Sequence, residues 1–122
     1  EIRLSLVGSE MCIRDRFCLG LPGAREDYKW GGVRVFSIAG NKMFAVQHLR
    51  GDSLAFKVDQ ELFLGHVDRP GIAPAPYLAR AHWIIMNTPY PLGASELEAL
   101  LQRSHQLVVS KLPKRVQVGL LL

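Results

Sequence analysis

The sequence is poor in cysteine and has no long apolar run. Its two cysteines, Cys12 and Cys18, are spaced for neither a disulfide framework nor a zinc site. No uninterrupted apolar stretch approaches the roughly 18 residues that a membrane-spanning helix needs. No basic segment followed by an apolar one marks a secretory signal. These features predict a cytoplasmic protein that does not insert into a membrane.

The sequence also lacks the common signatures of catalysis and cofactor binding. Its histidines form neither an HExxH motif nor an i, i+4 pair, so we expect surface or hydrogen-bonded imidazoles rather than metal ligands. No glycine-rich phosphate loop occurs. Adjacent Glu26 and Asp27 suggest a solvated turn, and Cys18 suggests a small buried hydrophobe. We therefore expect no enzymatic activity, no metal and no cofactor.

What the sequence does contain is the composition of one globular domain. Of its 122 residues 48% are hydrophobic and 21% are charged, which is enough to build a single core and argues against disorder. The sequence has fifteen basic and eleven acidic residues, which gives a net charge of +4. An excess of this size suits an anionic partner, but it is also common in proteins that bind no nucleic acid.

Alternating apolar residues predict an antiparallel meander from residue 33 onward. Residues 33–40 and 42–49 are rich in β-branched and aromatic side chains, and glycine 40 with asparagine 41 can form the tight turn between them. The Arg-Gly-Asp string at 50–52 is read as the next turn. Residues 53–58 form the third strand, with one face expected to be buried and the other wetted.

The second half of the chain predicts a helix, a stiff connection and one more strand. Asp59 can cap a short helix over residues 60–67. Three prolines and a glycine within residues 70–77 indicate an extended surface connection. Residues 82–88 then read as a strand, which prolines 89 and 91 terminate.

A helix closes the chain. Ser95 and Glu98 form a capping box, and Lys111, Lys114 and Arg115 stand near the expected C-terminal end, where the helix dipole favours cations. The apolar stripe at helical spacing consists of Leu97, Leu100, Leu101, Ser104, Leu107, Val108 and Leu112. With the meander, this helix indicates an α+β fold on an antiparallel sheet.

Five motifs, in order from residue 17 to about residue 118, resemble the MmcQ/YjbR family. They are FCLGLPGAREDYKWG, GNKMFAV, LAFKVD, RPGIAPAPYLARAHW and ELEALLQRSHQLVVSKLPKRV. The resemblance implies a secretion-chaperone-like, YjbR-like α+β fold in the order α-β(3)-α-β(2)-α. Its antiparallel sheet would have about five strands and flanking helices. The single domain would span residues 17–122 and lack the start of its first helix.

The same resemblance implies DNA binding and no catalytic residue. Candidate nucleic-acid-binding positions are Lys29, Arg34, Lys42, Lys57, Arg80, Lys111, Lys114 and Arg115. Cations interleaved with aromatics suit phosphate contact and base stacking. The motif aromatics are Trp30, Tyr77 and Trp83, and we expect these to organise the packing of the sheet and the proline-rich connection. A common binding surface requires the cations to lie on one face of the fold.

Two functions therefore stay open, with a third behind them. The first is DNA binding of low or no sequence specificity through a basic face. The second is a protein- or peptide-binding adaptor, which the chaperone-like fold suggests, although fold is a weak guide to function. A small-molecule site beneath PAPYLARAHW ranks last for want of a nucleophile, base or metal set. We expect a monomer without membrane contact.

Residues 1–16 are expected to be foreign to the domain. Residues 6–16, LVGSEMCIRDR, agree without mismatch with one reading frame of a transposase sequencing adapter. We therefore interpret residues 1–16 as an adapter-derived, non-native segment and exclude it from functional argument. Residues 1–9 should be poorly anchored, and any first helix should begin near Ser9 or Glu10 and run into Leu19.

Re-sequencing of the genomic locus tests the origin of this segment. We expect the codons for residues 6–16 to be absent upstream of the codon for Phe17, with a different coding sequence in their place. Finding the same codons in genomic DNA, outside any adapter, would contradict the interpretation.

Overall fold

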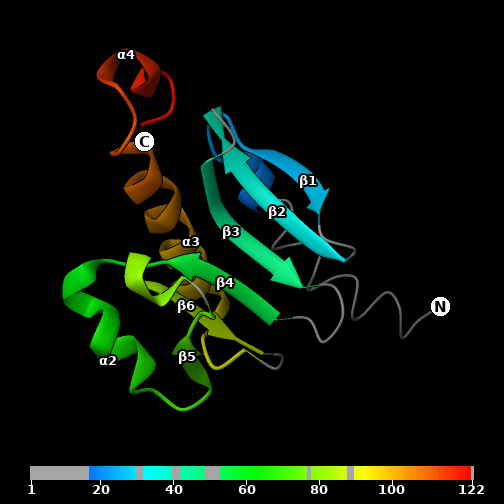
Figure 1. Ribbon diagram of the computed structural model, residues 1–122, viewed down its shortest axis with the longest axis vertical. Coiled ribbons are helices and arrows are strands. Elements are labelled where there is room, and N and C mark those ends of the chain that lie inside the picture. Colours follow the sequence, from blue (N-terminus) through cyan, green and yellow to red (C-terminus); the bar gives the residue numbers. More distant parts are fainter. Residues whose placement is uncertain are drawn as a thin grey trace.

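A six-stranded antiparallel sheet forms the centre of the molecule, and the long helix α3 (Ala94–Val109) packs on one of its faces (Figure 1). The computed structural model describes residues 17–29, 32–39, 42–48, 53–76, 78–87 and 90–121. The strands are β1 (Arg25–Lys29), β2 (Val33–Ile38), β3 (Lys42–His48), β4 (Ser53–Lys57), β5 (Ile72–Pro74) and β6 (Trp83–Met86), in the spatial order β1-β2-β3-β4-β6-β5. The predicted α+β class is confirmed.

Strand β1 was not predicted from the sequence. It pairs with β2 from Arg25 opposite Ser37 to Lys29 opposite Val33, so the supposed turn at Glu26 is wrong. Four of its five residues are exposed, and the strand therefore lacks the apolar alternation that marks a half-buried strand. Charged side chains are a usual feature of an edge strand because they discourage pairing with other chains.

The proline-rich connection contains the opposite edge strand. Residues 72–74 pair with β6, from Ile72 opposite Met86 to Pro74 opposite Ile84. Proline is tolerated there because an edge strand needs no donor on its outer side. Strand β6 itself is shorter than the expected 82–88. The sheet thus has six strands rather than about five.

The helix predicted over residues 60–67 is present as two short pieces, the 3-10 helix η2 (Gln60–Leu62) and α2 (Phe63–Val67). Asp59 stands at the predicted N-cap position, but its side chain makes no capping hydrogen bond. Its carboxylate instead binds Arg103 of α3, with Nη2–Oδ1 and Nε–Oδ2 distances of 2.7 and 2.9 Å. This ion pair ties the α2 region to the long helix.

Helix α3 differs from its prediction at both ends. It begins at Ala94 with Gly93 as N-cap, so Ser95 lies inside the first turn and the capping box is wrong. The N–H of Leu97 donates to the carbonyl of Gly93 at 2.9 Å. The helix ends at Val109, and α4 (Lys114–Gln117) follows Pro113 as a separate turn. Proline prevents a continuous helix because it lacks an N–H and its ring clashes with the preceding turn.

Both faces of the sheet are covered. The first core lies between the sheet and α3 and includes Phe36, Phe44, Phe56, Leu101 and the predicted small hydrophobe Cys18. A second cluster on the other face consists of Val35, Val46, Ala55, Ala75 and Trp83. Ala55 was expected on a wetted face but is only 4% exposed. The chain between β5 and β6 supplies Ala75 to this second face and so helps to shield Ala55 from water.

Several predictions fall outside the described residues. These are the foreign segment 1–16 with its helix start, the turns at 40–41 and 50–52, and the aromatic residues Trp30 and Tyr77. Among the residues that are described, no helix is long and apolar enough to cross a membrane.

Candidate functional site

Four basic side chains gather at one end of the sheet, and we call them the basic cluster. Lys42 begins β3, Lys57 ends β4, Arg80 lies in the 3-10 helix η3 (Ala79–Ala81), and Lys111 follows the end of α3. Because β3 and β4 are antiparallel, with Ala45 opposite Phe56, the start of one strand lies beside the end of the other. The fold thereby joins cations that are up to 69 residues apart in the sequence.

Two adjoining surface hollows run through the basic cluster. The smaller, of about 240 Å³, is lined by Lys42, Trp83 and the C-terminal end of α3. The larger, of about 420 Å³, is lined by Arg80 and the β4–η2 connection. Lys57 and Lys111 line both hollows, so one elongated anion could reach all four cations.

The cluster concentrates positive charge. Burial lowers the pKa of the Lys57 ammonium, and the nearby positive charge of Lys111 lowers it further. The ammonium donates a hydrogen bond to the carbonyl of Ala81 at 2.5 Å. Within the described ranges, none of the four cations forms an ion pair with a carboxylate.

Two acidic residues, Asp59 and Glu61, also line the larger hollow. The hydrogen bonds from Arg103 lower the pKa of the Asp59 carboxyl, so this carboxylate is already engaged by a cation outside the cluster. Glu61 is exposed. The most concentrated positive charge therefore lies on the side of Lys42, Lys57 and Lys111.

The remaining predicted cations do not join the cluster. Lys29 ends β1 opposite Val33, at the far end of the sheet from Lys42. Arg34 forms an ion pair with Glu26, with an Nε–Oε2 distance of 2.7 Å, and donates to the Tyr28 hydroxyl at 2.7 Å. The candidate cations thus do not share one face.

The last two candidate cations, Lys114 and Arg115, and the aromatic residue Trp83 also lie outside the basic cluster. Lys114 and Arg115 are exposed on α4, beyond the C-terminal end of α3 (Figure 1). Trp83 is 5% exposed within the second core cluster, which confirms its expected packing role. It is too enclosed to serve as a stacking platform for an unpaired base.

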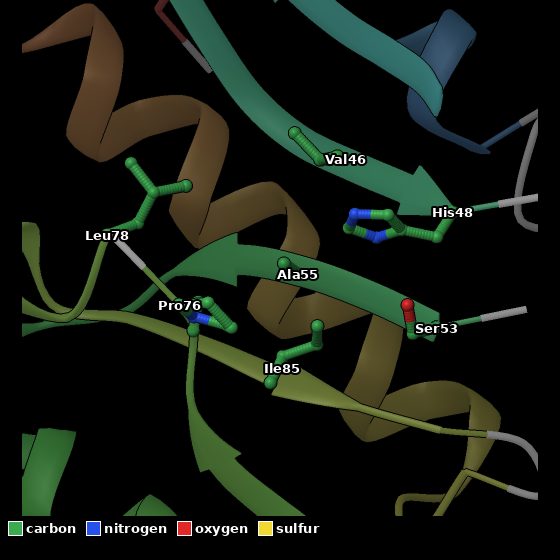
Figure 2. Close-up of a pocket in the computed structure, with 8 residues that line it drawn as sticks. Val46, His48, Ser53, Ala55, Pro76, Leu78 and Ile85 are labelled. Carbon is green, nitrogen blue, oxygen red and sulfur yellow. The ribbon is translucent and has the colours of Figure 1, made fainter. Parts of the chain in front are cut away.

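A third hollow lies on the face of the sheet turned away from α3, which passes behind the sheet in Figure 2. Its volume is about 320 Å³. It is lined by Val46, His48, Ser53, Ala55, Ala75, Pro76, Leu78 and Ile85. We call it the apolar pocket. Ala75, Pro76 and Leu78 belong to the proline-rich motif, beneath which a pocket was predicted.

No sequence pattern indicated the other walls of this pocket. Val46 and His48 are two residues apart on β3 and therefore point to the same face of the sheet. On β4, Ala55 is a small residue between the larger Leu54 and Phe56. A small residue in a strand leaves space only if a second layer encloses it. That layer comes from a distant segment, so only the tertiary structure reveals it.

A family model described as YjbR matches residues 19–107. The chain belongs to the YjbR family. The resemblance inferred from the sequence motifs is therefore confirmed, and the fold of this YjbR domain agrees with it.

Three solved structures are similar to this YjbR domain. The Deinococcus radiodurans protein DR2400, with family-model domain DUF419, is 28% identical with a TM-score of 0.71, over 85% of this chain and 82% of that one. A Pseudomonas syringae crystal structure is 29% identical with a TM-score of 0.58, over 70% and 86%. A P. syringae solution structure, 24% identical with a TM-score of 0.55 over 87% and 91%, shows the fold alone. No curated protein matches the sequence.

Proposed function

We propose that this YjbR domain binds DNA through phosphate contacts made by the basic cluster. The observation that carries the proposal is the convergence of Lys42, Lys57, Arg80 and Lys111 on two adjoining hollows. Like charges held this close repel one another, and an anionic ligand would relieve the repulsion. Lysine ammonium groups act as compact point charges and bind phosphate without requiring a fixed orientation.

The chemistry of the cluster supports backbone contact rather than base reading. Flexible lysines reach phosphates, whereas sequence readout needs planar, bidentate groups placed against base edges. Trp83, the aromatic residue beside the lysines, is buried. The proposed binding is therefore of low sequence specificity.

A salt titration with a fluorescent DNA duplex tests this function. Four phosphate contacts release enough counterions for the affinity to fall roughly a hundredfold between about 50 and 200 mM salt. Fluorescence anisotropy at several salt concentrations gives the slope of log affinity against log salt. An absence of binding at the lowest salt would refute the proposal, and a protein- or peptide-binding role would then be tested first.

Charge-neutralising substitutions assign the contact surface. The double variant Lys42→Gln, Lys111→Gln changes two exposed side chains and is expected to reduce the magnitude of the salt slope by about 2. Lys29→Gln is the matched control, because Lys29 lies at the other end of the sheet. An equal loss of affinity in Lys29→Gln would show that binding is not localised at the basic cluster.

A further inference from the structure

We infer that the apolar pocket is a binding site for a small, uncharged organic molecule with an apolar body and one hydrogen-bonding group. This site is separate from the basic cluster. The pocket reaches the end of the sheet where His48 pairs with Ser53, whereas Lys42 and Lys57 stand at the other end of the same strands.

The shape of the pocket suits a small ligand. A volume of about 320 Å³ falls at the lower end of the range for organic ligands, roughly 300–1,000 Å³. The residues at its base are part of the packed second cluster, because Val46, Ala55 and Ala75 are only 5%, 4% and 2% exposed. Strands β3, β4 and β6 and the segment after β5 all contribute to the walls. A preformed hollow of this kind needs little ordering when a ligand enters.

The polar groups of the pocket lie together at one end. His48 and Ser53 are direct partners across β3 and β4, and Figure 2 shows both side chains beside the space above Ala55. The Nδ1 atom of His48 is inaccessible to solvent, yet it has no hydrogen-bond partner among the residues that the structure describes. Buried ring nitrogens are normally paired. Rotation of the imidazole toward the hollow would let a ligand hydroxyl or amide at this end supply the missing partner.

The lining also determines the charge of the ligand. The eight described lining residues include no Lys, Arg, Asp or Glu, so a charged ligand would lose its hydration without gaining an ionic partner. A neutral phenol, alcohol or amide meets both requirements: its apolar body fills the space between Val46, Leu78 and Ile85, and its polar group faces His48. A volume of about 320 Å³ suits one small molecule rather than an extended peptide.

Methyl-detected NMR on the full chain provides the test, with p-cresol as the probe. We expect p-cresol to shift the methyl signals of Val46, Ala55 and Ile85. Toluene, which lacks the hydroxyl group, is expected to bind about tenfold more weakly, because it leaves the His48 nitrogen unpaired. The charged analogue p-toluate should not bind. Absence of shifts at these methyl groups, or equal binding of all three probes, would overturn the inference.

Substitutions inside the pocket separate binding from general hydrophobic adsorption. Ala55→Leu fills the cavity and should abolish the p-cresol shifts, whereas Ala99→Leu on the exposed side of α3 should leave them unchanged. If Ala55→Leu does not fold, His48→Phe tests the same inference. This substitution removes the ring nitrogens but keeps an aromatic ring, so it should lower the affinity for p-cresol to that for toluene. Undiminished p-cresol affinity in His48→Phe would refute the polar contact.

The DNA-binding proposal and this inference can fail independently. The double variant Lys42→Gln, Lys111→Gln should retain full p-cresol binding, because neither lysine lines the apolar pocket. Loss of p-cresol binding in that variant would contradict the separation of the two sites.

Discussion

Replacement of Ser104 by alanine is expected to lower the free energy of unfolding by about 3 kcal/mol. Ser104 lies on α3 with no exposed surface. Its hydroxyl donates to the carbonyl of Phe44 on β3 at 2.6 Å and accepts from the backbone N–H of Lys57 on β4 at 3.0 Å. The substitution removes a hydrogen-bond partner from both strand groups, and the loss of a partner in a buried place carries a desolvation cost.

Urea denaturation followed by circular dichroism measures this effect. Ser110→Ala is the matched control, because Ser110 follows the same helix and its hydroxyl donates to the carbonyl of Leu107, but the residue is exposed. We expect this control to change the free energy of unfolding by no more than about 0.5 kcal/mol. Equal effects of the two substitutions would show that the bridge from Ser104 to the strands contributes little.

Replacement of His105 by glutamine is expected to cost about 2–3 kcal/mol near neutral pH. The imidazole has no exposed surface and packs edge-on against Phe44, with ring centroids 5.2 Å apart. Its Nε2 donates to the carbonyl of Pro22 at 2.7 Å, and its Nδ1 accepts from the Gln106 amide at 2.8 Å. Glutamine cannot fill the ring's place and retain both hydrogen bonds.

His105 should also make stability depend on pH. Burial lowers the pKa of its imidazole below the ordinary 6.5, although the bond to Pro22 opposes the shift. As the pH falls below 6.5, the unfolded chain therefore gains a proton before the folded protein does. Stability is full above that pH and decreases as the pH falls towards the folded-state pKa. Denaturation between about pH 7.5 and 5.5 should show this decrease in the parent protein and a flatter profile in His105→Gln.

His66→Gln is the comparison for the pH effect. Burial also lowers the pKa of His66, but this imidazole lies on the short helix α2 and is only partly enclosed. The substitution His66→Gln should therefore flatten the pH profile of stability less than His105→Gln does. An unchanged pH profile in His105→Gln, or an equal flattening in His66→Gln, would contradict the role assigned to His105.

Local sequence patterns predicted much of the fold. The meander from β2 to β4, the helical region at 60–67 and the long α3 all follow from the period at which apolar residues recur. Strand β1 escaped prediction because its residues are mostly charged and exposed, and β5 because Pro74 and the prolines on either side of the strand are typical of a loop. The start of α3 was misjudged because Ser95 and Glu98 match a capping box, whereas the helix begins at Ala94 with Gly93 as N-cap and no side-chain capping bond.

The candidate sites depended more on the tertiary structure. Eight cations were equal candidates in the sequence, and strand register decided that Lys42 and Lys57 meet whereas Lys29 stands at the other end of the sheet. Ser104 was predicted to lie on the buried stripe of its helix, but its hydrogen bonds to two strands follow only from how α3 crosses the sheet.

The sequence by itself determined the family, the fold class and the burial of Leu54 and Phe56 on β4 and of Leu97 and Leu101 on α3, because these residues recur at the period of their strand or helix. The tertiary structure alone decided which distant residues become neighbours. Lys57 and Lys111 share two hollows, and Ala55 lies beneath the segment that carries Ala75, because β-pairing and helix packing bring separate segments together. Both proposed sites arise from such non-local contacts, which no local pattern encodes.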